Sequence, residues 1–67
     1  MRVNNRNLPE ILRYLRGRKG MSKATLSRMS GVSVSGIVRY ENGERSPNIT
    51  TLWKLLDVLK ADIEIIY

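Results

Sequence analysis

The side chains in this sequence that could do chemistry are cations and helix-starting hydroxyls in the middle of the chain. Ser22 and Ser33 each precede a short amphipathic segment, as N-cap residues do, and Gly31 separates the two segments. Arg39 lies in the second segment. The N–H groups at a helix start bind anions, and an arginine fork matches the edge of a guanine base. The spacing therefore predicts a helix-turn-helix over residues 22–41.

This chain has few of the residue types that catalysis and metal binding require. It contains no cysteine and no histidine, which excludes disulfides, thiolate ligands and imidazole bases. The carboxylates lie at expected helix ends or in the tail, without paired spacing, and the serines have no base to activate them. We therefore expect no enzymatic activity, no cofactor and no metal site.

The sequence also gives no sign of membrane insertion or export. No apolar run approaches the roughly 20 residues of a membrane span. The N-terminal arginines are not followed by the apolar core of a signal peptide. We expect a cytoplasmic protein with no membrane partner.

The charge is unevenly distributed along the 67 residues. The net charge is +6, but residues 1–40 carry nine basic residues and one acid, whereas residues 41–67 carry three basic residues and five acids. A surface polarised in this way attracts polyanions, most often nucleic acid. Charge alone leaves a solvated basic surface as the alternative.

Hydrophobic spacing and capping residues predict four helices in a single domain over residues 1–67. A loose basic arm, residues 1–7, precedes a first helix that Asn7 caps and Gly20 ends. The two central helices start at Ser22 and Ser33, and Asn48 caps the fourth. The expected apolar positions are Leu8, Ile11, Leu12, Leu15, Leu26, Met29, Ile37, Tyr40, Leu52, Trp53, Leu55, Leu56, Val58 and Leu59.

The last residues, 61–67, differ from the rest because they are β-branched and partly alternating. They predict a short strand, and a lone strand has nothing to pair with in an otherwise helical chain. An unpaired apolar edge is a liability in solution, so pairing with a second copy is the economical solution. The dimerisation residues would be Ile63, Ile65 and Tyr67. A short fifth helix is the alternative.

The order of these signals resembles the Cro/cI-type (XRE-like) helix-turn-helix repressor family from about Leu12 to Leu59. The resemblance rests on Leu12-Arg13-x-Leu15-Arg16, Lys19-Gly20-Met21-Ser22, Leu26, Gly31-Val32-Ser33, Ile37, Glu41-Asn42-Gly43 and Pro47-Asn48. It implies an all-α, compact four- to five-helix lambda-repressor-like domain. The sequence departs from the family pattern at Lys23, Ser27, Gly36 and Lys60, where Gln, Ala, a residue with a side chain and Gly are usual.

The resemblance also implies roles for individual residues on double-stranded DNA. The third helix would enter the major groove, with base contacts from Val34, Ser35 and Arg39. Phosphate contacts would come from Ser22, Lys23, Ala24, Asn42, Gly43 and Arg45. Arg16 and Glu41 would form an internal ion pair, and Tyr40 and Trp53 would be core residues rather than base-stacking groups.

The implied function is a transcriptional repressor that reads a pseudo-palindromic operator as a homodimer. The alternative is a DNA-binding antitoxin whose acidic, apolar C-terminal half also binds a toxin protein. A protein-binding adaptor with no DNA role would leave the basic face idle. RNA binding lacks a visible aromatic platform, because the chain has three Tyr, one Trp and no Phe.

Overall fold

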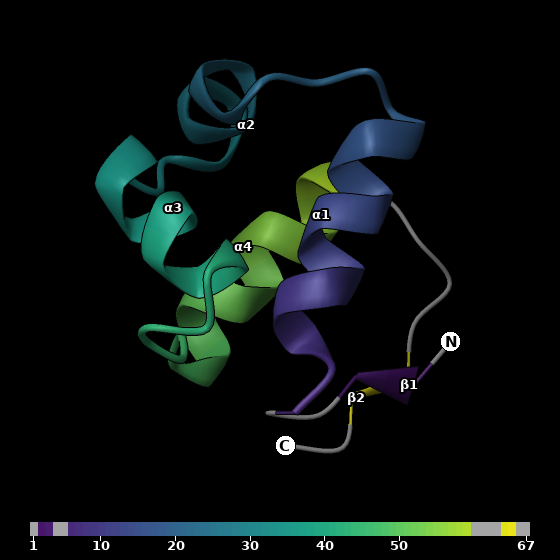
Figure 1. The fold of residues 1–67 in the computed structure, drawn as a ribbon. Coiled ribbons are helices and arrows are strands. Elements are labelled where there is room, and N and C mark those ends of the chain that lie inside the picture. The colour runs from purple at the N-terminus through teal and green to yellow at the C-terminus, as the bar shows by residue number, and fades with distance from the viewer. Residues whose placement is uncertain (1, 4–5, 60–63, 66–67) are drawn as a thin grey trace.

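Four helices and two very short strands make up the computed structural model over the residues that it describes, which are 2–3, 6–59 and 64–65 (Figure 1). In chain order the elements are β1 (Arg2–Val3), α1 (Leu8–Arg18), α2 (Lys23–Ser30), α3 (Val34–Glu41), α4 (Ile49–Leu59) and β2 (Glu64–Ile65). The all-α fold expected from the sequence is confirmed. The chief packing partners are α1 with α3, and α2 with both α3 and α4.

Side-chain caps start three of the helices where the sequence predicts them. The Ser22 hydroxyl accepts from the Thr25 N–H at 3.0 Å, and the Ser33 hydroxyl accepts from the Gly36 N–H at 3.1 Å. Asn48 Oδ1 accepts from the N–H three residues on at 2.8 Å. Each bond satisfies one of the amides that a helix start leaves without an internal acceptor. These caps fix where α2, α3 and α4 begin.

The first helix begins differently from the prediction. Asn7 stands at the N-cap position of α1 but makes no side-chain cap. Its backbone has φ −100° and ψ −6°, which is helical rather than the extended conformation that a capping residue adopts. The prediction of an Asn7 cap is therefore wrong. Pro9 still occupies the first turn, where its missing N–H costs nothing.

The turn between α2 and α3 depends on Gly31, which has φ +77°. A side chain at such a left-handed position is strained, so glycine is the favoured residue there. The Gly31 N–H donates to the Ser27 carbonyl at 2.9 Å, and this bond closes the end of α2. The predicted left-handed conformation is confirmed, and it allows only three residues to connect α2 and α3.

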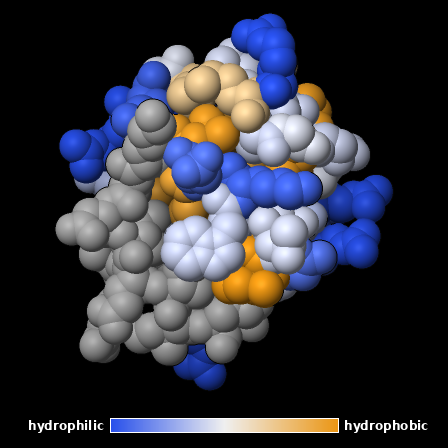
Figure 2. All heavy atoms as spheres, turned by 180° about the vertical axis from the view of Figure 1, so that it is seen from behind, coloured by the Kyte–Doolittle hydropathy of each residue, from blue (hydrophilic) through white to orange (hydrophobic). Residues whose placement is uncertain are grey.

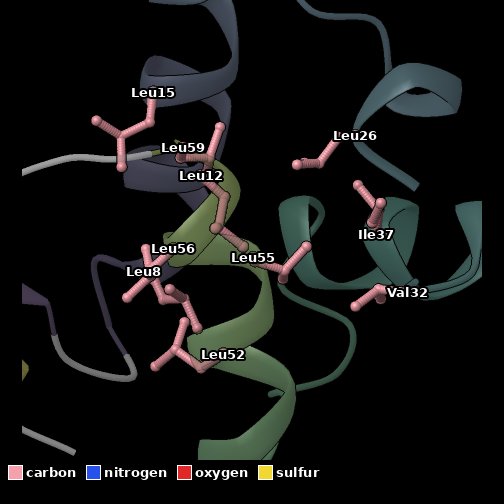
Figure 3. Close-up of a cluster of buried hydrophobic side chains, with 10 residues drawn as sticks. All are labelled: Leu8, Leu12, Leu15, Leu26, Val32, Ile37, Leu52, Leu55, Leu56 and Leu59. Carbon is pink, nitrogen blue, oxygen red and sulfur yellow. The ribbon is translucent and has the colours of Figure 1, made fainter. Parts of the chain in front are cut away.

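A single apolar cluster joins all four helices (Figure 3). Val32 in the turn and Ile37 in α3 both belong to it, and Met21 packs against it from the loop before α2. These contacts hold the two central helices on the α1–α4 pair. The buried members are Leu8, Leu12, Leu15, Leu26, Val32, Ile37, Leu52, Leu55, Leu56 and Leu59.

Two residues expected in the core lie at the surface instead. The side chain of Met29 is 58% exposed and that of Trp53 is 56% exposed. In α2 only Leu26 is buried, because the helix has eight residues and meets the core along a narrow stripe. In α4 the buried stripe consists of leucines, and Trp53 lies beside it rather than within it. The prediction that both are core residues is wrong.

The two strands pair with each other in parallel, with Arg2 opposite Glu64 and Val3 opposite Ile65. A strand is thus present within the predicted range 61–67. The argument that it has no partner in its own chain is wrong, because the expected N-terminal arm supplies β1. Of the predicted dimerisation residues, Ile63 and Tyr67 lie outside the described residues. Dimerisation through this segment stays a prediction.

Candidate nucleic-acid interface

The start of α2 presents backbone amides to solvent. Ser22 and Ala24 are exposed and Lys23 is half-buried. The amides of Lys23 and Ala24 are at the first two positions of the helix, so they have no acceptor within it. The Ser22 hydroxyl accepts a hydrogen bond from the Thr25 N–H and donates one to Oγ1 of Thr25, each at 3.0 Å. Two amides and one ammonium are thus available for an anion at this end.

The outward face of α3 carries the residues predicted to read bases. Ser35 and Arg39 are exposed and lie four positions apart, so they neighbour each other on one helix face. Val34 is 43% exposed at the first turn, and Val38 is half-buried. Ile37 on the opposite side is in the core. The predicted base-reading residues therefore all reach solvent from a helix whose other face is anchored.

A bidentate ion pair fixes the end of α3 to α1. Nε of Arg16 lies 2.8 Å from Oε2 of Glu41, and its Nη2 lies 3.0 Å from Oε1. Arg16 Nη1 also donates to the Met21 carbonyl at 2.9 Å, which ties in the loop before α2. The Glu41 side chain is buried, at 1% exposure. The ion pair that the family resemblance implies is present.

This pairing also changes the titration of Arg16. Hydrogen bonds from the guanidinium to Glu41 raise the pKa of Arg16 above its ordinary value, although partial burial acts in the opposite sense. The guanidinium is therefore charged at neutral pH.

The residues after α3 were predicted to contact phosphate, and the structure places them at the surface. Asn42, Gly43 and Arg45 are exposed. The Gly43 N–H already donates to the Tyr40 carbonyl at 3.3 Å, and Asn42 Nδ2 donates to Glu44 Oε1 at 3.3 Å. Arg45 has no ion pair within residues 6–59. Of these three groups, the Arg45 guanidinium is the one most available for a phosphate.

Further cations surround these elements, and one of them was missed in the sequence analysis. Arg28 is exposed on α2, four positions after Ala24, so it extends the face that begins at the helix start. Its helical spacing from Ala24 was the signal that could have identified it. On α1, Arg18 lies over the ring of Tyr14, with Cζ 5.8 Å from the ring centroid.

Other kinds of site find no support in the part of the chain that the structure describes. No group of three or more acidic, histidine or cysteine side chains gathers there in a way that could hold a metal ion. Among the same residues, each helix is too short or too polar to cross a membrane.

Capped, core-anchored α2 and α3, with cations on the exposed face, define a helix-turn-helix domain. The chain matches the helix-turn-helix family model over residues 12–66 and belongs to the Cro/cI-type family of DNA-binding helix-turn-helix proteins. It is 43% identical over 56 residues to the HTH-type transcriptional repressor RghR of Bacillus subtilis (strain 168). That match covers 82% of this chain and 42% of the relative, so the chain spans about two fifths of the relative's length.

Proposed function

We propose that this chain binds double-stranded DNA sequence-specifically by placing α3 in the major groove, and that it represses transcription where its site overlaps a promoter. The observation that carries the proposal is the exposed face of α3, with Arg39 at its centre, on a helix held by Ser33, Ile37 and Glu41. A helix fixed at both ends and along its inner face keeps its outer side chains in register with base edges. RghR, a repressor by name, supports the regulatory part.

Base reading is assigned to Val34, Ser35 and Arg39. Arg39 can donate two hydrogen bonds to O6 and N7 of one guanine, which is worth about 1–3 kcal/mol of discrimination. The apolar side chain of Val34, exposed at the first turn, suits a thymine methyl group. Ser35 donates or accepts a single bond and therefore discriminates less. The sequence preference should rest chiefly on Arg39.

Phosphate contacts are assigned to both ends of the helix-turn-helix. The amides of Lys23 and Ala24, which the Ser22 cap leaves without an acceptor because it binds the Thr25 N–H, favour an anion at the positive end of α2. Arg45 would hold the backbone beyond α3, with Asn42 beside it. The Gly43 amide would have to be shared with Tyr40, to which it already donates, and contributes least. Arg28 is added to this set because its exposed guanidinium lies on the same face of α2 as Ala24.

Two copies would act together on a two-fold symmetric site. The half-sites of a pseudo-palindrome lie about one helical turn apart, which matches one α3 per major groove on the same side of the duplex. With about 6–10 phosphate contacts per dimer, affinity should fall about 10³–10⁵-fold between 50 and 200 mM salt. Such a regulator would work in the cytoplasm and needs no cofactor.

Selection of binding sites from random duplex DNA, at about the ionic strength of the cell, tests the proposal. The expected result is an enriched inverted repeat, and Arg39→Ala should then lose preference at one position in each half-site. Lys54→Ala, on the exposed side of α4, is the matched control and should keep the preference. Absence of enrichment with folded protein would refute sequence-specific regulation and favour a protein partner or non-specific nucleic-acid binding.

A further inference from the structure

We infer that the outward face of α1 is a binding site for single-stranded nucleic acid, separate from the helix-turn-helix. The site, which we call the α1 platform, consists of four exposed residues in the second half of this helix: Arg13, Tyr14, Gly17 and Arg18. It lies on a different helix from the proposed duplex contacts and binds a different form of nucleic acid, so it does not depend on the proposed function. The ligand is a strand with unstacked bases, of DNA or RNA.

Tyr14 gives this face an exposed aromatic ring. Its side chain is 52% exposed, and the guanidinium of Arg18 lies over the ring, with Cζ 5.8 Å from the ring centroid. The two residues are four positions apart, so they are neighbours on one side of the helix. Bases of single strands stack on aromatic rings and on arginine planes. An aromatic platform, which was not expected from the sequence, is therefore present at the surface.

Gly17 leaves open space beside this ring. It lies three positions after Tyr14 and four after Arg13, and a Cβ atom at position 17 would meet nothing within 4 Å. Its backbone is helical, so it is not one of the glycines with positive φ. Glycine inside a helix costs up to about 1 kcal/mol relative to alanine. Neither the conformation nor the packing of α1 requires a glycine here, whereas the close approach of a ligand to the helix does.

Charge selects a polyanion for this face. Arg13, Arg18 and Lys19 are exposed and have no ion pair within residues 6–59. Glu10, the one acid of α1, lies a turn before Tyr14 and limits the basic surface to the second half of the helix. Figure 2, seen from behind, shows blue hydrophilic side chains on the edge where α1 lies as well as on the edge of α2 and α3. An anionic ligand is therefore attracted to the place where the ring and the open space lie.

The combination of ring, open space and separated cations fits a single strand. Arg13 and Arg18 lie about 7.5 Å apart along the helix axis, so they can hold the phosphates on either side of one base. Each unit of a strand supplies both a flat base and an anion. A duplex keeps its bases stacked inside, and an acidic peptide supplies anions without a flat group in every unit. The α1 platform therefore suits a strand better than either.

Fluorescence anisotropy of a labelled oligothymidylate of about ten nucleotides tests the site, and oligouridylate of equal length compares RNA with DNA. Tyr14→Ala should weaken binding about 5- to 150-fold, the size of one stacking contact, and Tyr14→Phe should retain it. Trp53→Ala is the matched control. Its side chain is 56% exposed, but it lies beside Lys54 and Asp57, whose charges cancel, so binding should be unchanged. Equal losses in the two alanine variants, or no binding of either strand, would overturn the inference.

Gly17→Leu separates the site from the stability of the fold. Leucine favours a helix more than glycine does, so the variant should unfold at a higher urea concentration than the native chain. Its side chain fills the open space, and strand binding should therefore fall about as much as in Tyr14→Ala. A stable Gly17→Leu variant that binds the strand with native affinity would show that the space is not used and would overturn the inference.

Salt and a duplex distinguish the α1 platform from the helix-turn-helix. Arg13→Ala should reduce the slope of log strand affinity against log salt by about 0.7, because one phosphate contact is lost, whereas Tyr14→Ala should leave the slope unchanged. Arg28→Ala, on α2, is the reciprocal control and should weaken binding to a duplex but not to the strand. Strand binding that depends on Arg28 rather than Arg13 would place the strand on the helix-turn-helix and overturn the inference. Failure of the chain to select a duplex site would count against the proposed function only.

Discussion

The hydroxyl oxygen of Ser33 occupies space that a side chain at Gly36 would need. Oγ of Ser33 accepts the Gly36 N–H at 3.1 Å, and a Cβ atom at position 36 would lie 3.0 Å from the same oxygen. The other neighbours of such a Cβ lie at ordinary contact distance, 3.7 Å. The cap of the recognition helix and the absence of a side chain in its first turn are therefore linked.

This link predicts that the effect of Gly36→Ala on stability depends on whether the Ser33 hydroxyl is present. Alanine gains about 1 kcal/mol of helix propensity over glycine, but in the native chain crowding against Ser33 offsets that gain. In a Ser33→Ala background the oxygen is gone, and Gly36→Ala should stabilise by about 1 kcal/mol. Urea unfolding of the four proteins gives the coupling as a double-mutant cycle. Equal effects in both backgrounds would mean that the two residues are independent.

Removing one partner of the Arg16–Glu41 pair should destabilise the fold strongly, whereas replacing both partners with apolar residues should destabilise it little. Arg16→Met leaves the Glu41 carboxylate buried without a counter-charge and should destabilise the fold by about 3–5 kcal/mol. Arg16→Met with Glu41→Leu removes both charges and should recover most of that loss. Thermal and urea unfolding measure both variants. If the double variant were no more stable than Arg16→Met, the buried charge would not be the cause.

The raised pKa of Arg16 predicts how stability depends on pH. A basic group whose pKa is raised on folding contributes stability that is complete below its unfolded pKa and is lost as pH rises through the folded one. For arginine that window lies above the usual alkaline range, so the pair should contribute equally from about pH 7 to 10.

Arg16→Lys should lower the pH at which the contribution of this pair to stability is lost, so that the loss can be measured. Lysine has an ordinary pKa of about 10.4, so the variant should lose stability relative to the native chain as pH rises beyond about 10. The difference in unfolding free energy between the two proteins, measured in urea from neutral to alkaline pH, checks this. A difference that stays constant across the series would argue that position 16 acts by packing rather than by charge.

Substitutions of Arg45 and of Arg39 should change DNA binding in different ways, and the dependence of affinity on salt distinguishes the two. Arg45→Ala should weaken binding to all DNA sequences alike and reduce the slope of log affinity against log salt by about 1 per copy, because a phosphate contact is lost. Arg39→Ala should mainly relax specificity at one base pair. Fluorescence anisotropy with a selected site and a scrambled site, at several salt concentrations, distinguishes them. Uniform weakening by Arg39→Ala would reassign it to the phosphate backbone.

Features coded by neighbouring residues could be predicted from the sequence. The caps at Ser22, Ser33 and Asn48, and the left-handed Gly31, each depend on a few adjacent positions, and all are confirmed. The Arg16–Glu41 pair came from the family pattern, because nothing in the local sequence links residues 25 positions apart. Which residues contact DNA stays a prediction.

The features that could not be predicted depend on contacts between elements that are distant in the sequence, and on how much of each helix those contacts bury. Helical spacing shows which side of α2 and α4 is apolar, but not that Met29 and Trp53 lie beyond the edge of the core. The β1–β2 pair joins the two ends of the sequence, and two-residue strands leave no periodic signal. Asn7 has the right residue type for a cap and the wrong backbone conformation, which sequence does not reveal.

The anchoring of α3 at its start, its middle and its end has a thermodynamic consequence for binding. An eight-residue helix is too short to be stable by itself in water, so an unanchored α3 would have to fold on the DNA. Here the helix arrives already ordered. Association should therefore show the small heat-capacity change of rigid docking, without the entropic penalty that accompanies a segment folding as it binds.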